Sequence, residues 1–274
     1  MKGHLDLLAA PGANGATVLR RQSFAPPIHI SKPHVDAGWL VVNLASPTPG
    51  LFAGDVVEAS VEVERGARLL LTAPSASRIH TMAGGVAELR QQFRVQAGGA
   101  LDVWPEYLIP QVGSRYRQRT RIDMEPGGTL LWTESVAPGR AARGEVFAYA
   151  ELRLATDVYV GGVQVVRERY ALGQGSVAVQ ALRQRFAEAY YASVIAVGDA
   201  AKDLDLRGTH ALHDPEEAWV GASRLGDGAM VVKIVAGNSP ALRRTVERVR
   251  GELFRGMGMT GASLRRVTGA PLVA

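Results

Sequence analysis

Carboxylates placed beside glycine-containing turns are the side chains of this sequence best suited to chemistry. They are Asp55, Glu106 and Glu145, the last at the end of the segment Pro138-Gly-Arg-Ala-Ala-Arg-Gly-Glu145. Carboxylate oxygens can act as acids, bases or metal ligands. A Gly-Asp pair before a strand is also an ordinary turn cap. The third segment is more specific, because two glycines flank Arg140 and Glu145 in a loop between two β segments.

No catalytic signature accompanies these carboxylates. The sequence lacks a Gly-x-x-x-x-Gly-Lys-Ser/Thr loop, His-Glu-x-x-His, Gly-x-Ser-x-Gly and a strand-Gly-x-Gly-x-x-Gly-helix unit. Close histidine pairs occur at His29 and His34 and at His210 and His213. The second pair has a spacing suited to two metal ligands on a helix, but no third ligand is evident, so we predict surface or capping histidines. We therefore expect a protein that is not an enzyme.

Composition restricts the kinds of metal site, compartment and partner that we expect for this protein. The 274 residues contain no cysteine, which excludes disulfides and thiolate metal sites. No apolar run resembles a signal peptide or approaches the roughly 20 residues that span a bilayer, so we expect a cytoplasmic protein without a membrane partner. The net charge of +5 and the pI near 9.7 suit an acidic partner. Arginine usage typical of a GC-rich genome explains the same charge.

A repeat organises the middle of the chain. Three segments share an apolar residue, a glycine three positions later and a leucine three positions after that: Val63-Glu-Arg-Gly-Ala-Arg-Leu69, Val95-Gln-Ala-Gly-Gly-Ala-Leu101 and Met124-Glu-Pro-Gly-Gly-Thr-Leu130. Each is flanked by β-forming residues and predicts a strand, a tight turn and a returning strand. Residues 158–163 resemble a weaker fourth copy. We predict stacked antiparallel hairpins in layered sheets, β-helix-like or sandwich-like, over about residues 57–165.

Two predicted strands have faces of opposite charge. In 57–64, valine and alanine alternate with Glu58, Ser60, Glu62 and Glu64, as expected for a half-buried strand. In 114–122 one face carries Arg115, Arg117, Arg119 and Arg121. Like charges along a strand need carboxylates or a partner beside them. The acidic strand is the predicted neighbour, and docking of an acidic partner is the alternative.

Helical patterns are concentrated near the end of the chain. Ser239 as N-cap and Pro240 begin a helix with apolar residues at spacings of three and four. A weaker helical pattern spans 199–212, and 181–196 is ambiguous with a strand-like run from Tyr190. We predict one domain over residues 1–274, mainly β, with an α+β portion over about 180–274 containing one or two helices.

Four motifs together resemble the UreD (UreH) urease accessory protein family over about residues 20–260. They are Gly50-Leu-x-x-Gly54-Asp55, Leu69-Leu-Leu-Thr72-x-Pro-Ser75, Leu101-Asp-Val-Trp-Pro-Glu106 and Gly139-Arg140-x-x-x-Gly144-Glu145. The sequence departs from the family pattern where Pro49 replaces a glycine and where a common aromatic residue is missing near Ile79.

This resemblance implies a role in urease maturation without catalysis. Family members act with a UreF-type protein and a UreG-type GTPase to deliver nickel to apo-urease, whose active site holds two nickel ions. A transient nickel path, with no tightly bound cofactor, calls for oxygen ligands that release the ion. The residues we assign to this path are Asp55, Thr72, Ser75, Glu106, Glu134 and Glu145. The motif residues given a structural role are Gly50, Gly54, Gly139, Arg140 and Gly144.

Other functions remain open on the sequence alone. The chain could be an adaptor that recruits the GTPase complex without touching nickel, or a paralogue that no longer serves urease. Nucleic-acid binding through the arginine face comes next, since that stretch has one aromatic residue and no binding motif. An enzyme built on a carboxylate pair is the last alternative.

Overall fold

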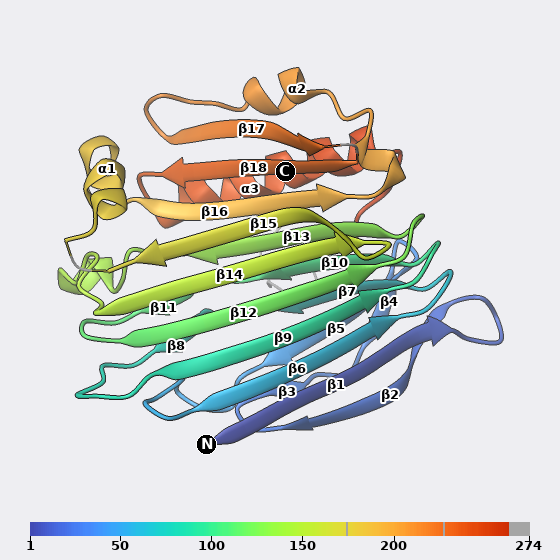
Figure 1. Cartoon of the computed structure of the whole chain (residues 1–274), viewed down its shortest axis with the longest axis horizontal. Helices are drawn as coiled ribbons and strands as arrows, with labels where there is room; N and C mark the ends of the chain where they lie inside the picture. Colours follow the sequence, from blue (N-terminus) through green and yellow to red (C-terminus); the bar gives the residue numbers. More distant parts are fainter. Residues whose placement is uncertain (174, 227, 263–274) are drawn as a thin grey trace, which may run out of the picture.

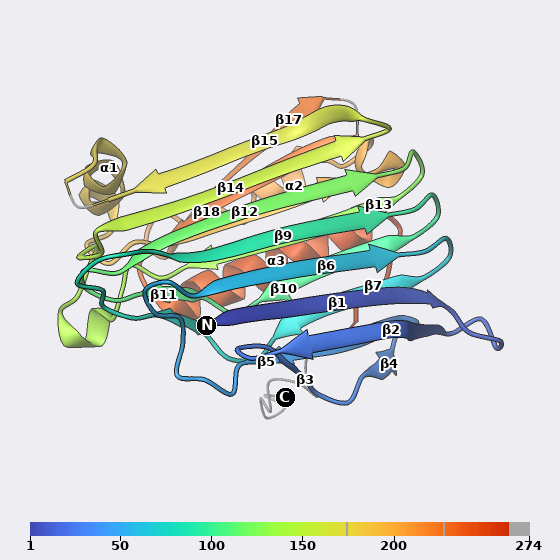
Figure 2. The same cartoon turned by 60° about the horizontal axis from the view of Figure 1, so that its bottom comes forward.

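A computed structural model describes residues 1–173, 175–226 and 228–262, and in it the chain forms two packed β-sheets and a helical layer (Figures 1 and 2). Within these residues the outer sheet has seven strands and the central sheet eleven. The outer sheet runs in the order β15 (Val163–Leu172), β14 (Glu151–Val160), β12 (Arg115–Met124), β9 (Ala87–Val95), β6 (Val56–Val63), β1 (Lys2–Pro11) and β2 (Thr17–Ala25).

Part of the central sheet lies behind the outer sheet in Figure 1, and the rest of it extends above. Its main order is β17 (Ala218–Gly226), β18 (Ala229–Ala236), β16 (Tyr190–Val197), β13 (Thr129–Val136), β10 (Ala100–Pro105), β7 (Arg68–Ala73), β5 (Trp39–Ala45) and β3 (His29–Ile30). Short strands pair beside this path: β4 (His34–Asp36), β8 (Ser77–Ile79) and β11 (Leu108–Pro110). The remaining elements are α1 (Val177–Arg185), α2 (Leu206–His210), α3 (Ser239–Gly256) and the 3₁₀ turns η1 (Ala141–Arg143) and η2 (Asp199–Ala201).

The sequence repeat corresponds to the turns of a β-solenoid, and the described strands make about four such turns. Equivalent residues of successive repeats lie side by side. Val63 of β6 lies beside Val95 of β9, which lies beside Met124 of β12. The second arms align in the same way, since Leu101 lies between Leu69 and Leu130. The repeat glycines stack as well, and the Gly98 N–H donates to the Gly127 carbonyl at 2.9 Å. The mainly β, β-helix-like class predicted from the sequence is confirmed.

Strand pairing within the repeats differs from the predicted antiparallel hairpins. The two arms of one repeat enter different sheets, and each pairs in parallel with the same arm of the next repeat. The fourth, weaker copy is a true antiparallel hairpin, formed by β14 and β15 around Gly161 and Gly162. The acidic strand β6 pairs with β1 and β9 and not with the arginine strand β12, because β9 of the intervening repeat separates them.

Apolar side chains on both faces of the central sheet hold the layers together. Side chains of the outer sheet such as Val61, Phe93 and Ile122 pack with Leu69, Leu101 and Trp132 of the central sheet. On the other face of the central sheet, Leu70 and Leu131 belong to a core that includes the α3 residues Leu242, Val246, Val249 and Leu253. The central strands are therefore buried on both faces, which explains continuous apolar runs such as Leu69–Leu71.

The predicted C-terminal helix is confirmed as α3, with a shift of one residue at its start. Asn238, not Ser239, is the N-cap, and its side chain accepts a hydrogen bond from the Ala241 N–H at 2.8 Å. The ambiguous 181–196 region divides into the end of α1 and strand β16. The last part of the predicted α+β portion, residues 263–274, lies outside the described residues. None of the described helices is long and apolar enough to cross a membrane.

Candidate functional site

A cavity of about 420 Å³ lies between the outer and central sheets. Its lining extends from the loops at 46–51 and 75–78 to Glu134 of β13, and includes apolar residues such as Leu71, Phe93 and Trp132. Of the residues predicted for a nickel path, Ser75, Glu106 and Glu134 line it. The solenoid positions them, because successive turns place residues of β7, β10 and β13 side by side.

Glu134 is a buried carboxylate with two hydrogen-bond donors from the outer sheet. Its side chain lies on the inter-sheet face of β13, and the residue is 8% exposed. The Gln118 amide donates to Oε1, and the Thr156 hydroxyl donates to Oε2 at 3.3 Å. Burial, followed by the nearby negative charge of Glu168, raises the pKa of Glu134 to about 7. Near neutral pH this carboxyl can therefore exchange between proton-bound and charged forms.

A second carboxylate, Glu168, extends the polar interior toward β16 and β18. It lies beside Thr156 in the β14–β15 hairpin. Its carboxylate forms an ion pair with Lys233 and accepts hydrogen bonds from the Ser193 hydroxyl at 2.9 Å and the Tyr191 hydroxyl at 3.1 Å. We call the set Gln118, Glu134, Thr156, Glu168, Ser193 and Lys233 the interior polar cluster. It connects the two sheets through side chains where the rest of their interface is largely apolar.

Glu106 lies at the loop end of the cavity and is tied to the helical layer. Its carboxylate forms an ion pair with Arg243 of α3, and its side chain is 18% exposed. Burial raises the pKa of Glu106, and the charge of Arg243 opposes that rise. Ser75 lies in the neighbouring loop of the same lining. Together they give this end of the cavity hydroxyl and carboxylate oxygens.

Asp55 and Thr72 are buried but are not among the residues that line the cavity. The Asp55 carboxylate accepts hydrogen bonds from the N-terminal ammonium of Met1 at 2.6 Å and from the Phe52 N–H at 2.8 Å. The Thr72 hydroxyl donates to the Trp104 carbonyl at 2.6 Å, joining β7 to β10. Both side chains hold backbone segments next to the cavity.

Glu145 and Arg140 of the Gly-Arg-x-x-x-Gly-Glu motif form an ion pair. Arg140 Nε donates to Glu145 Oε2 at 2.8 Å, and the same oxygen accepts from the Val112 N–H at 3.1 Å. The hydrogen bonds from Arg140 lower the pKa of Glu145. Gly139 has φ +140°, and a Cβ there would lie 2.2 Å from the Glu145 carbonyl oxygen, so this loop requires glycine. Glu145 is absent from the cavity lining.

The other predicted glycines adopt backbone conformations that explain their place in the motifs. Gly50, Gly54 and Gly144 all have positive φ. Gly50 also approaches another strand closely, since a Cβ there would lie 2.4 Å from the Arg78 carbonyl oxygen. This contact holds the 46–51 loop against β8 at the edge of the cavity.

The paired histidines contribute backbone contacts. His210 Nε2 lies 3.3 Å from the Ala222 nitrogen, and His213 Nδ1 accepts from the Val220 N–H at 3.2 Å, so both hold β17. Within residues 1–173, 175–226 and 228–262, no group of three or more His, Cys, Asp or Glu side chains is arranged to hold a metal ion.

Five members of the interior polar cluster were missed by sequence reasoning: Gln118, Thr156, Glu168, Ser193 and Lys233. Thr156 carries a signal that could have found it. It occupies an inward position between Leu154 and Val158, which are apolar and buried. A polar residue at such a position needs a buried partner.

Comparisons with known proteins agree with one another. The model of the family described as UreD urease accessory protein matches residues 1–268. A protein named urease accessory protein UreD from Opitutus terrae is 40% identical over 255 residues, covering 92% of this chain and 93% of that relative. A protein of the same name from Deinococcus radiodurans is 34% identical over 251 residues, covering 88% and 87%.

Proposed function

The chain belongs to the UreD urease accessory protein family, a family of non-catalytic proteins of urease maturation, and from this premise we propose a nickel-conducting role. With UreF-type and UreG-type partners, the chain receives Ni²⁺ and passes it to apo-urease for assembly of the dinuclear nickel site. The ion is cargo, and the chain needs only to hold it briefly and release it.

The observation that carries this proposal is a cavity between two sheets with an ionisable carboxylate buried inside it. Such a cavity would ordinarily be apolar and dry. Here Glu134 offers oxygen ligands beside Gln118 and Thr156, and its pKa of about 7 lets it give up a proton when a cation arrives. Carboxylate, hydroxyl and amide oxygens hold Ni²⁺ less tightly than a cage of imidazoles or thiolates.

The rest of the cluster suits passage better than storage. Lys233 already neutralises Glu168, so a cation at Glu134 meets a nearby ammonium group as well as a carboxylate. That charge shortens the residence of a divalent ion by repulsion. We assign Ser75 and Glu106 to the loop end of the path and Glu134 to its interior, and we assign Asp55, Thr72 and Glu145 to holding its walls.

The decisive experiment is maturation of purified apo-urease by the complete set of accessory proteins with nickel and bicarbonate. Two variants, Glu134→Leu and the isosteric Glu134→Gln, are compared with Glu216→Leu, which removes an exposed carboxylate that does not line the cavity. Nickel per urease active site is measured by elemental analysis, and co-purification of the accessory complex is measured in parallel.

We expect both Glu134 variants to lower nickel occupancy while the accessory complex still assembles. Full occupancy with both variants would overturn the conduit. If nickel occupancy were unaffected but the chain were still required for assembly, the protein would be an adaptor that recruits its partners without touching nickel.

A further inference from the structure

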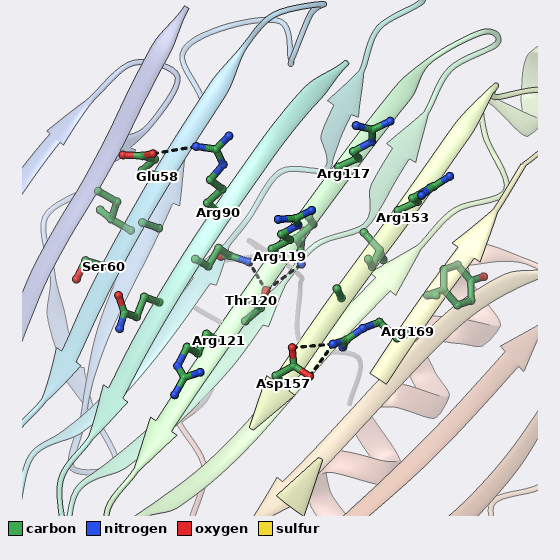
Figure 3. A pocket seen from close by; sticks show the side chains of 18 of the residues that line it. Glu58, Ser60, Arg90, Arg117, Arg119, Thr120, Arg121, Arg153, Asp157 and Arg169 are labelled. Atoms are coloured by element: carbon green, nitrogen blue, oxygen red, sulfur yellow. Dashed lines mark hydrogen bonds and ion pairs between the residues drawn. The ribbon is translucent and has the colours of Figure 1, made fainter. Parts of the chain in front are cut away.

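A groove of about 1140 Å³ crosses the solvent-facing side of the outer sheet, opposite the face that lines the cavity (Figure 3). Arginines outnumber carboxylates among its charged residues. It contains three carboxylates and a larger set of arginines from four adjacent strands: Arg90, Arg117, Arg119, Arg121, Arg153 and Arg169. The carboxylates are Asp6, Glu58 and Asp157. We call this feature the arginine groove.

Strand register brings these arginines together. Arg119 of β12 lies directly beside Arg90 of β9 on one side and Ala155 of β14 on the other, and Arg169 of β15 lies beside Ala155. Like charges at directly paired positions on a sheet repel each other. Small side chains at Ser60, Ala155 and Ala171 leave the floor hollow between the cations.

Most arginines of the groove have a carboxylate partner, and Arg119 is the exception. Arg117 and Arg153 share Glu151, and Arg169 pairs with Asp157. Arg90 pairs with Glu58 and Glu88, and Arg121 with Asp123. Arg119 is exposed and has no hydrogen-bond or ion-pair partner within the described part of the chain. A guanidinium placed among other cations without a carboxylate is set up to receive one from outside.

We propose that the arginine groove docks an acidic surface of a protein partner, with a partner carboxylate bound by Arg119. The inference deepens the proposed function and rests on it in one respect, that the partner belongs to the urease maturation assembly. A planar guanidinium can bind a carboxylate through two parallel hydrogen bonds, which fixes orientation as well as position. The flanking ion pairs surround that contact with alternating charges.

The pattern of charge favours a protein over a nucleic acid. Glu58, Asp6 and Asp157 would repel a phosphate backbone, whereas a protein surface can match them with lysine or arginine. Nucleic-acid grooves also present aromatic side chains for base stacking. The tyrosine in this lining, Tyr170, is stacked on Tyr191, and nearby Tyr159 is covered by the guanidinium of Arg121 at 4.1 Å.

The test measures the affinity of the full chain for purified apo-urease, for the UreF-type protein and for an RNA probe, each separately and at low and physiological salt. The variants are Arg119→Glu and Arg119→Glu/Arg153→Glu. Glu151 keeps Arg117 in the double variant, so no buried carboxylate loses its last partner. The matched control is Arg94→Glu, an exposed arginine on the same face of β9 that does not line the groove.

We expect Arg119→Glu to weaken binding to one of the two proteins by about tenfold or more and to reduce its salt dependence. Arg94→Glu should leave both affinities within about twofold, a change expected of a rim charge that makes no contact. The proposal is wrong if both groove variants bind both proteins as the unchanged chain does, or if they lose affinity only for an RNA probe. Nickel occupancy with Glu134 variants is read in a different assay, so failure of the conduit and failure of the docking surface are distinguishable.

Discussion

Arg250 of α3 and Asp102 of β10 form a buried ion pair across the interface of the helix with the central sheet. Arg250 Nη2 donates to both carboxylate oxygens at 2.6 and 2.8 Å, and the two side chains are 4% and 2% exposed. The same guanidinium donates to the Thr133 hydroxyl at 2.7 Å and lies over the Trp104 ring at 4.2 Å. Residues 102 and 133 belong to strands whose other faces meet the cavity, so this pair stabilises its rear wall.

Breaking this ion pair from one side should destabilise the fold more than removing it entirely. Arg250→Met or Asp102→Leu alone leaves a buried charge without a partner, which costs about 3 to 5 kcal/mol. We expect the free energy of unfolding of the double variant to lie closer to that of the unchanged chain than the value of either single variant does. Urea denaturation of the three variants measures the energetic coupling between Arg250 and Asp102. Losses of the two single variants that simply add up in the double variant would contradict the prediction.

Replacing Glu134 with glutamine should stabilise the chain at alkaline pH. A carboxyl whose pKa is raised by folding binds its proton more tightly in the folded chain. Its contribution to stability is therefore present below about pH 4.5 and is lost as the pH rises through about 7. We expect Glu134→Gln to gain up to about 3 kcal/mol over the unchanged chain at pH 8 and little at pH 5. Denaturation at both pH values tests this, with Glu216→Gln as a control that shows no such difference.

Filling the loop end of the cavity should slow nickel delivery without unfolding the chain. Ala73 lines the cavity together with Ser75 and Glu106, and a phenylalanine side chain there would fill part of it. Because the cavity has room, we expect Ala73→Phe to change the free energy of unfolding by about 1 kcal/mol or less. Nickel occupancy of urease should fall severalfold at early times. Ala13→Phe, in an exposed turn, is the control; equal time courses would show that the path lies elsewhere.

Two glycines of the same loop should tolerate alanine very differently. Gly139→Ala places a methyl group 2.2 Å from the Glu145 carbonyl oxygen, and we expect a loss on the order of 3 kcal/mol. Gly144 has φ +73° but nothing within 4 Å of its would-be Cβ, so Gly144→Ala should cost about 1 to 2 kcal/mol. Thermal denaturation compares the stability of the two variants. Equal losses of stability would mean that the positive φ of the two glycines, and not the close contact at Gly139, sets the cost of each substitution.

The spacing of the sequence repeats predicted the fold better than the glycine turn residues did. Val63, Val95 and Met124, which the repeat spacing aligns, pair side by side in the strands, because similar repeats bury the same face when they stack. A glycine turn looks the same whether it closes a hairpin or carries the chain from one sheet to the other. The distinguishing signal is the run Leu69–Leu71, which is apolar on both faces and so belongs to a strand covered on both sides.

The candidate site was less predictable, because its contacts join distant segments. Glu134 meets Gln118 and Thr156 only through the order of strands across the sheets, which local patterns do not encode. Asp55 and Glu145 illustrate the opposite case. Each has a hydrogen-bond partner within five residues, Phe52 or Arg140, and such local partners are a reason to predict a structural role before a functional one.

Both sheets end in strands that reverse the parallel direction of the solenoid: β15 and β2 in the outer sheet, and β17 and β3 in the central sheet. A bare parallel turn would offer a second molecule the same hydrogen-bonding edge that its own next turn uses. Chains could then add to one another indefinitely, as in fibrils. The reversed strands terminate that growth, so a protein made of self-complementary turns can remain a discrete particle that meets its partners through side chains and not through its backbone.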